Sequence, residues 1–239
     1  MKVVGIASSS KGNAYLVEHG GAAVLVDCGV PYCMLRDFAF DAVLITHSHT
    51  DHVSGLKTLL DHRDLPVYAN VATAETVAHD CEIDESAFVC FENGQAFPVG
   101  AFEARAFSIP HDTSDPVGYL LSADGETYFH GTDIGSPLDS VGRALAEATV
   151  ATLESNHDLT LLFESARPQS LKSRICGPRG HLSNDQAAEL VRRYASARLR
   201  ELNLAHLSRD CNAPHLAEGE MKAALAELGR EDVALRIFL

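Results

Sequence analysis

Short apolar runs alternate with polar gaps through the first half of the chain, and this spacing predicts β-strands. The runs are rich in Val, Ile, Leu, Phe and Tyr, and the gaps hold the Gly, Asp and Asn that are typical of turns. Asp124-Gly125 is a strong two-residue hairpin signal. The predicted strands cover residues 2–7, 14–17, 22–29, 41–46, 66–70, 88–91 and 101–110, followed by a hairpin over 117–133.

Helices are predicted between and after the strands, where capping residues mark their ends. Asn70 is a helix N-cap, Ser136 precedes a proline at the first helical position, and Ser183 with Gln186 forms a capping box. The predicted helices cover residues 55–60, 71–79, 137–147, 184–197 and 214–228. Strands and helices bury their apolar faces best in layers, so the pattern predicts one α/β domain over residues 1–239, with two packed sheets and helices outside.

Composition narrows the class of protein. A chain of 239 residues fits one large domain with a sizeable core. No run approaches the roughly 20 apolar residues of a membrane span. The six cysteines include no CxxC pair, which is typical of reduced thiols. We therefore expect no membrane partner and a cytoplasmic location.

The formal net charge of -14 excludes a surface that attracts nucleic acid everywhere, but one window departs from it. Between Ser165 and Asn184 the chain has no acidic residue. Its four basic residues there are Arg167, Lys172, Arg174 and Arg179. This window predicts a local basic groove.

The stretch "THSHTDH" places four metal-ligand side chains within six residues, directly after an apolar strand. They are His47, His49, Asp51 and His52. Imidazole and carboxylate are the usual ligands of zinc and similar divalent ions. On an extended loop His47 and His49 point the same way, whereas Asp51 and His52 are expected to point apart, so the segment can serve two neighbouring ions.

Two ions need further ligands, and three residues at the ends of strand-like runs qualify. His111 follows "FSIP", Asp133 follows "TYFHGT", and His206 follows "LNLA". Loops after strands gather at one edge of a sheet, which would bring these residues to the histidine motif. His157 in "ESNHD" also follows an apolar run, and we expect it at the rim of the site.

These motifs resemble the metallo-β-lactamase fold of metallohydrolases, whose architecture is a four-layer αββα sandwich. The resemblance implies that His47, His49 and His111 hold one ion and that Asp51, His52 and His206 hold the other. Asp133 would bridge the two ions. Asp27, which follows the apolar run in "VLVDCG", would support the histidine loop.

The order and spacing of "FSIPHD", "LESNHD", "SLKSRI", "GHLSN" and "LAHLS" are most similar to the YycJ-like branch of that family. That branch commonly has Ser-Gly-Ser-x-Gly-Asn near the N-terminus, whereas this chain has Ser at position 9. The resemblance makes Ser10 and Asn13 of this loop candidate substrate contacts. His157, from its expected place at the rim, and Lys172, Arg174 and Arg179, from their charge, are further candidates. "GHLSN" also resembles a motif of tRNA 3′-processing enzymes, which implies that His181 assists the leaving group; Asp51 and His181 are the candidate catalytic residues.

The predicted function is a metal-dependent phosphodiesterase. Two divalent ions (Zn, Mn or Fe) can generate a hydroxide near neutral pH and clamp a phosphodiester oxygen. The family resemblance implies a 5′ to 3′ exonuclease acting on single-stranded DNA. Two alternatives remain: a hydrolase of cyclic or other small phosphodiesters with a narrow pocket, and a regulatory binding protein with a structural metal site.

Overall fold

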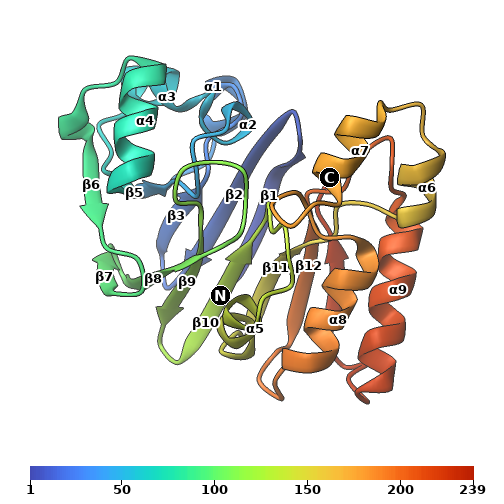
Figure 1. Ribbon diagram of the computed structural model, residues 1–239. Helices are drawn as coiled ribbons and strands as arrows, with labels where there is room; N and C mark the ends of the chain where they lie inside the picture. The colour runs from blue at the N-terminus through green and yellow to red at the C-terminus, as the bar shows by residue number, and fades with distance from the viewer.

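The computed structural model describes residues 1–239, and its two β-sheets lie face to face between two layers of helices (Figure 1). In spatial order the first sheet contains β1 (Lys2–Ser9), β2 (Gly12–His19), β3 (Ala22–Val26), β4 (Ala42–Leu44), β5 (Val67–Asn70) and β6 (Phe88–Phe91). The second contains β13 (Ala234–Ile237), β12 (Glu201–Ala205), β11 (Val150–Glu154), β10 (Glu126–Gly131), β9 (Val117–Ala123), β8 (Phe102–Ser108) and β7 (Ala96–Val99).

Both sheets change from antiparallel to parallel pairing along their length. β1 to β3 form a meander, and β3 to β6 run parallel. β7 to β10 form a second meander, and β10 to β13 run parallel. The carboxyl ends of β4, β8, β10, β11 and β12 therefore share one edge of the molecule. Ligands bind at such edges in α/β proteins, so this edge is the natural place for a site.

Helices cover the outer face of each sheet. The first sheet carries α1 (Tyr32–Leu35), α2 (Thr50–Val53), α3 (Leu56–His62) and α4 (Val71–Cys81), and a short 3-10 helix spans Glu85–Ala87. The second sheet carries α5 (Asp139–Ala146), α6 (Leu159–Glu164), α7 (Gln169–Ile175), α8 (Asn184–Tyr194) and α9 (Pro214–Glu227). None of these helices has both the length and the apolar character needed to cross a membrane.

Three buried clusters fill the spaces between the four layers. The cluster between the sheets includes Tyr15, Tyr119 and Tyr128, all fully buried. A second cluster joins the first sheet to its helices through residues such as Leu56, and a third joins the second sheet to α5, α8 and α9 through residues such as Leu190. This arrangement confirms the predicted αββα sandwich.

The capping residues place most of the predicted helices correctly. The Asn70 side chain accepts the Thr73 amide, and the capping box of Ser183 and Gln186 is complete. The start predicted at Pro137 is wrong, because α5 begins at Asp139 and the Ser136 hydroxyl donates to the Pro178 carbonyl instead. Four short helices (α1, α2, α6 and α7) escaped prediction, because four to seven residues cover at most about two turns and give only a weak helical period. Strand β7 escaped as well, since it contains Pro98 and proline is unusual inside a strand.

Candidate metal centre

All seven predicted ligand residues meet where the two sheets face each other. His47 and His49 lie on the loop after β4, and Asp51 and His52 lie in α2. The second sheet supplies His111 after β8, Asp133 after β10 and His206 after β12. Because each sheet contributes part of the set, the centre forms only when both sheets have packed.

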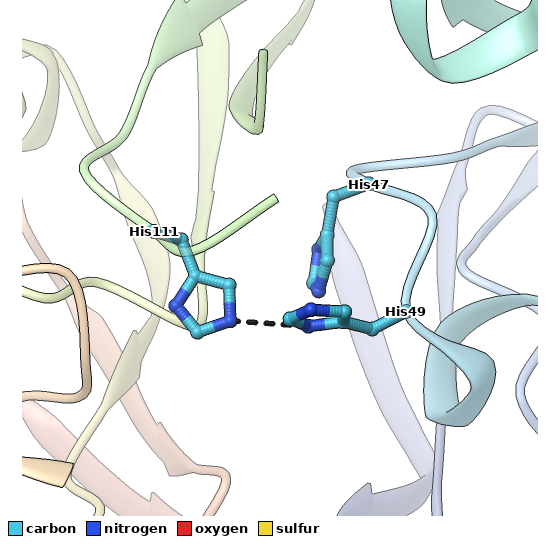
Figure 2. Close-up of side chains that lie close together, drawn as sticks. All are labelled: His47, His49 and His111. Carbon is cyan, nitrogen blue, oxygen red and sulfur yellow. Dashed lines mark hydrogen bonds between the residues drawn. The ribbon is translucent and has the colours of Figure 1, made fainter. Parts of the chain in front are cut away.

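Three histidines form the first group. The rings of His47, His49 and His111 converge from opposite sides of the centre, as Figure 2 shows. His111 Nε2 lies 3.2 Å from His49 Nδ1, and the centroids of the His47 and His49 rings are 4.8 Å apart. One ligand atom from each residue lies within 4.8 Å of the others, which is close enough for a shared cation.

Asp51, His52 and His206 form the second group, again with ligand atoms within 4.8 Å of one another. Asp51 Oδ2 lies 3.6 Å from His52 Nε2 and 3.8 Å from His206 Nε2. The expectation that Asp51 and His52 point apart is therefore wrong. Both residues lie in the single turn of α2, where neighbouring side chains are not on opposite sides as they are in an extended loop.

Asp133 lies between the two groups. Its Oδ2 is 3.1 Å from His52 Nε2, and its Oδ1 is 3.7 Å from His111 Nε2. His47 Nε2, His206 Nε2 and Asp133 Oδ2 are buried without a hydrogen-bond partner. Unpartnered buried polar atoms are costly, and these three belong to candidate ligands of the centre. The donor set fits divalent metal binding.

Four of the histidines are oriented through Nδ1, which leaves Nε2 for the centre. His52 Nδ1 donates to Asp27 at 2.7 Å, His111 Nδ1 to the Gly180 carbonyl at 3.0 Å, and His206 Nδ1 to Glu154 at 2.9 Å. His47 Nδ1 lies 3.0 Å from the Thr46 hydroxyl. An acceptor at Nδ1 fixes the tautomer and leaves the Nε2 lone pair for a metal ion.

Asp27 is located behind the histidine loop. One carboxylate oxygen accepts the Thr46 amide at 2.9 Å, and the other accepts His52. Its backbone is left-handed, with φ of 60°. Asp133 and His206 share this conformation, with φ of 58° and 57°. Such φ values are uncommon outside glycine and occur often at functional sites. The backbone conformation at these three strand ends therefore helps to direct the three side chains toward the centre.

Sequence reasoning missed Glu154, the fully buried carboxylate at the end of β11. Glu154 accepts the Ile134 and Leu182 amides through Oε2, at 2.8 and 3.0 Å. Its Oε1 accepts from the rings of both His206 and His181, each at 2.9 Å. The signal was present, because Glu154 ends an apolar run three residues before His157. A lone acid at a strand end is too common to single out.

Electrostatics in the centre depend on the buried carboxylates. Burial lowers the pKa of His47 well below its ordinary value, and the nearby His52 adds to the effect. Burial acts on His52 in the same direction, but the carboxylates of Asp27 and Asp133 outweigh it and raise the pKa of His52. Burial alone would raise the pKa of Glu154, yet the charges and hydrogen bonds of His181 and His206 lower it. Glu154 is thus held ionised, and its negative charge adds to the attraction of the centre for cations.

The centre opens into a polar cavity of about 150 Å³. Side chains of both ligand groups line it, and so do His181, Arg167 and Arg174. The cavity also includes Ser10, Asn156 and Ser208. A structural metal site normally closes around its ion, whereas this one has ligand residues exposed to a cavity, as a catalytic site requires.

Residues 24–202 of the chain match the β-lactamase superfamily domain. The chain belongs to that superfamily. It is 31% identical to the exodeoxyribonuclease YycJ of Bacillus anthracis, over 94% of this chain and 89% of the relative. It is 30% identical to the exodeoxyribonuclease WalJ of Streptococcus pneumoniae, over 93% and 87%. Both matches confirm the resemblance to the YycJ-like branch.

A solved structure supports the fold of this superfamily member independently of sequence. The metallo-β-lactamase fold protein YhfI from Bacillus subtilis superposes with a TM-score of 0.73, covering 98% of this chain and 95% of its own, at 19% identity. At that identity the likeness shows the fold alone.

The two candidate substrate contacts in the N-terminal loop, Ser10 and Asn13, have different surroundings. Ser10 is exposed and lines the cavity. Asn13 is buried, and its amide nitrogen lies 3.2 Å from Asp51 Oδ2, so it contacts a candidate ligand rather than the cavity. Ser9, where the family pattern has glycine, is the last residue of β1 and pairs with Gly12 without a positive φ. A side chain fits there.

Only two residues of the basic window, Arg167 and Arg174, line the cavity, and all four of its cations already have hydrogen-bond partners. Arg174 lines the cavity but donates to Asp112 at 2.5 Å, and Arg167 pairs with Asp210 at 3.0 Å. Lys172 is buried, with its ammonium 2.6 Å from the Phe163 carbonyl. Arg179 donates to the carbonyls of His111 and Thr113 and does not line the cavity. Sequence shows the charges but not these partners.

Two further histidines differ in outcome. His181 lines the cavity with its Nδ1 on Glu154, close to the position that the motif predicts. The expectation that His157 reaches the rim is wrong, because its ring is fully buried and lines no part of the cavity. Its neighbour Asn156 lines the cavity in its place.

Proposed function

We propose that the protein is a metal-dependent nuclease that hydrolyses DNA as a 5′ to 3′ exonuclease. The observation that carries the proposal is the pair of ligand groups, joined by Asp133, that faces a cavity containing His181 and two arginines. Curated relatives of similar length are exodeoxyribonucleases, which supports DNA as the substrate.

Two divalent ions per chain are part of the proposal. His47, His49 and His111 would hold one ion, Asp51, His52 and His206 the other, and Asp133 both. Charge supports this number. Four carboxylates lie in or directly behind the centre, namely Asp27, Asp51, Asp133 and Glu154. Buried charges need partners, and two divalent ions carry the four positive charges that balance these acids. Zinc, manganese and iron all suit this donor set.

Bound divalent ions would supply an activated water near neutral pH and offset the charge that develops on a phosphodiester. The chain's own residues supply orientation and a proton. Arg167 and Arg174 line the cavity on the side of α7 and can hold phosphate oxygens once their carboxylate partners release them. The buried side chains around His47 and His52 exclude bulk water from the floor of the centre.

His181 is the proposed proton donor to the leaving oxygen. Its Nδ1 donates to Glu154 at 2.9 Å, which fixes the orientation of the ring. The remaining nitrogen, Nε2, is then the atom that carries the transferable proton. Since Glu154 also accepts from His206, one carboxylate orients a candidate ligand and the proposed acid together.

A hydrolase of small phosphodiesters is the second candidate, and two observations favour it. The cavity of about 150 Å³ is small, and the cations of the basic window are paired or buried. A regulatory protein with a structural metal is less consistent with ligand side chains that line an open cavity.

The test is metal analysis followed by a time course on oligonucleotides labelled at either end. Single-stranded DNA with a 5′ phosphate should be shortened from that end, faster than the 5′-hydroxyl form, duplex DNA or matched RNA, with zinc, manganese or iron added. Rapid turnover of a cyclic or small phosphodiester, with no cleavage of any oligonucleotide, would decide for the second candidate.

A further inference from the structure

A second cavity of about 230 Å³ lies beside the catalytic one, and the two share the lining residues Leu207 and Ser208. The turn between β1 and β2 contributes to both, with Ser10 in the catalytic cavity and Ser9 in the second. This turn lies at the same end of the sheets as α7 in Figure 1. A ligand that fills the first cavity can therefore extend directly into the second.

Two cations at this junction have no carboxylate partner. Lys11 lies in the β1–β2 turn directly after Ser10, which lines the catalytic cavity, and Arg209 lines the second cavity. Both side chains are exposed, and their charged ends form no ion pair or hydrogen bond. The cations of the basic window differ, because Arg167 and Arg174 are already neutralised by Asp210 and Asp112. In a chain of net charge -14, free cations beside the catalytic cavity point to an anionic ligand.

The loop that carries Arg209 is held in a fixed position. The Ser208 amide donates to the Asn156 carbonyl at 2.8 Å, and the Asn212 side chain donates to the carbonyls of Ser155 and Asn156. The Cys211 amide donates to the Ser208 hydroxyl at 3.2 Å. Binding to such a preorganised loop loses less conformational entropy than binding to a mobile one.

We propose that the polynucleotide chain next to the scissile phosphate runs over the β1–β2 turn, where Lys11 binds one of its phosphates, into the second cavity, where Arg209 binds another. Leu207 and Pro214 provide apolar wall for a sugar or base. Leu239 also lines this cavity, and its terminal carboxylate forms no ion pair with Arg209. The inference rests on the proposed nuclease function and specifies which surface holds the DNA beyond the catalytic cavity.

The experiment compares the metal-loaded Lys11→Ala/Arg209→Ala protein with wild type on 5′-phosphorylated oligothymidylates. The KM for a long oligonucleotide should rise roughly tenfold, in line with two lost surface charge contacts. The log-log dependence of binding on salt should become shallower by about 1.4, since each single-strand phosphate contact contributes about 0.7. Turnover of bis(p-nitrophenyl) phosphate, which reaches only the catalytic cavity, should not change.

The charge-matched control is Arg143→Ala/Arg198→Ala. Both arginines are exposed without a carboxylate partner. Arg143 lies on α5, at the opposite end of the sheets from the β1–β2 turn (Figure 1). Equal KM and salt dependence for the two double variants would overturn the inference while leaving the nuclease function intact. A wild-type protein that turns over bis(p-nitrophenyl) phosphate but no oligonucleotide would overturn the proposed function and the inference together.

Discussion

At the scale of single residues, the centre depends on the hydrogen-bond partners that orient each candidate ligand. Four histidines present Nε2 because Nδ1 is engaged by Thr46, Asp27, Gly180 or Glu154. Asp133 has no comparable hydrogen-bond donor on Oδ2 and lies within 4 Å of histidines from both ligand groups. Loss of Asp133 should consequently affect both groups, whereas loss of a histidine should affect one.

We predict that Asp133→Ala lowers the occupancy of two metal ions per chain and that His206→Ala mainly depletes one. Removing even an outer partner of a metal ligand typically weakens metal affinity by about 10- to 100-fold, so the loss of Asp133 should be at least that large. The measurement is metal content by mass spectrometry after dialysis against a weak chelator. Full retention of both ions by the Asp133→Ala protein would contradict its place between the groups.

His181→Ala should leave metal content and folding nearly unchanged and slow DNA hydrolysis by roughly a hundredfold or more, the usual contribution of a general acid. The matched control is the substrate. A nitrophenyl phosphodiester has a leaving group that needs no proton, so its turnover should fall much less. Equal losses on both substrates would assign His181 a binding or structural role.

At the scale of elements, α2 is placed by close backbone packing as well as by its ligands. A Cβ on Gly29 would lie 1.7 Å from the carbonyl oxygen of Asp51, and the Cys28 amide donates to the His52 carbonyl at 2.8 Å. The loop after β3 therefore packs against the turn of α2 that carries Asp51 and His52 and fixes its position.

Gly29→Ala should destabilise the fold by about 2 kcal/mol, as overpacking of a close contact does, and should weaken metal binding by moving Asp51. Gly219→Ala is the matched control, since Gly219 lies in α9 with nothing within 4 Å of its added Cβ. That change should stabilise the protein by up to about 1 kcal/mol through helix propensity. The measurement is urea unfolding of both variants, with and without metal. Similar midpoints for Gly29→Ala and Gly219→Ala would contradict the proposed role of the loop after β3 in positioning α2.

The sequence predicts those elements and site residues that can be recognised from a short stretch of neighbouring residues. The motif of His47 to His52 and the capping box at Ser183 need no knowledge of neighbours. Glu154 and the pairing of Arg174 with Asp112 are tertiary facts, since each depends on a segment far away in the chain. Lys172 illustrates the same limit, because only the packing of α7 on α6 shows that its ammonium is buried.

At the scale of the whole molecule, the two sheets share one core and one metal centre. Tyr15 of β2 packs in the same buried cluster as Tyr119 of β9 and Tyr128 of β10. The candidate ligands are divided in the same way, with His52 on the first sheet's side and His206 on the second's. We propose on these grounds that residues 1–239 behave as one domain.

One domain should unfold in one transition that metal shifts as a whole. The chain has no tryptophan, and four of its six tyrosines belong to the inter-sheet cluster or pack against it, namely Tyr15, Tyr68, Tyr119 and Tyr128. Tyrosine fluorescence therefore reports chiefly the contact between the sheets, while far-ultraviolet circular dichroism reports the outer helices. The two midpoints in urea should coincide without metal. A metal concentration a hundred times the Kd should raise both by the equivalent of about 2.7 kcal/mol for each ion bound, because ligand binding to the native state alone stabilises every part that unfolds with it. If only one signal moved with metal, or if the midpoints separated, the halves of the chain would unfold independently and the ligands would belong to a site formed within one sheet.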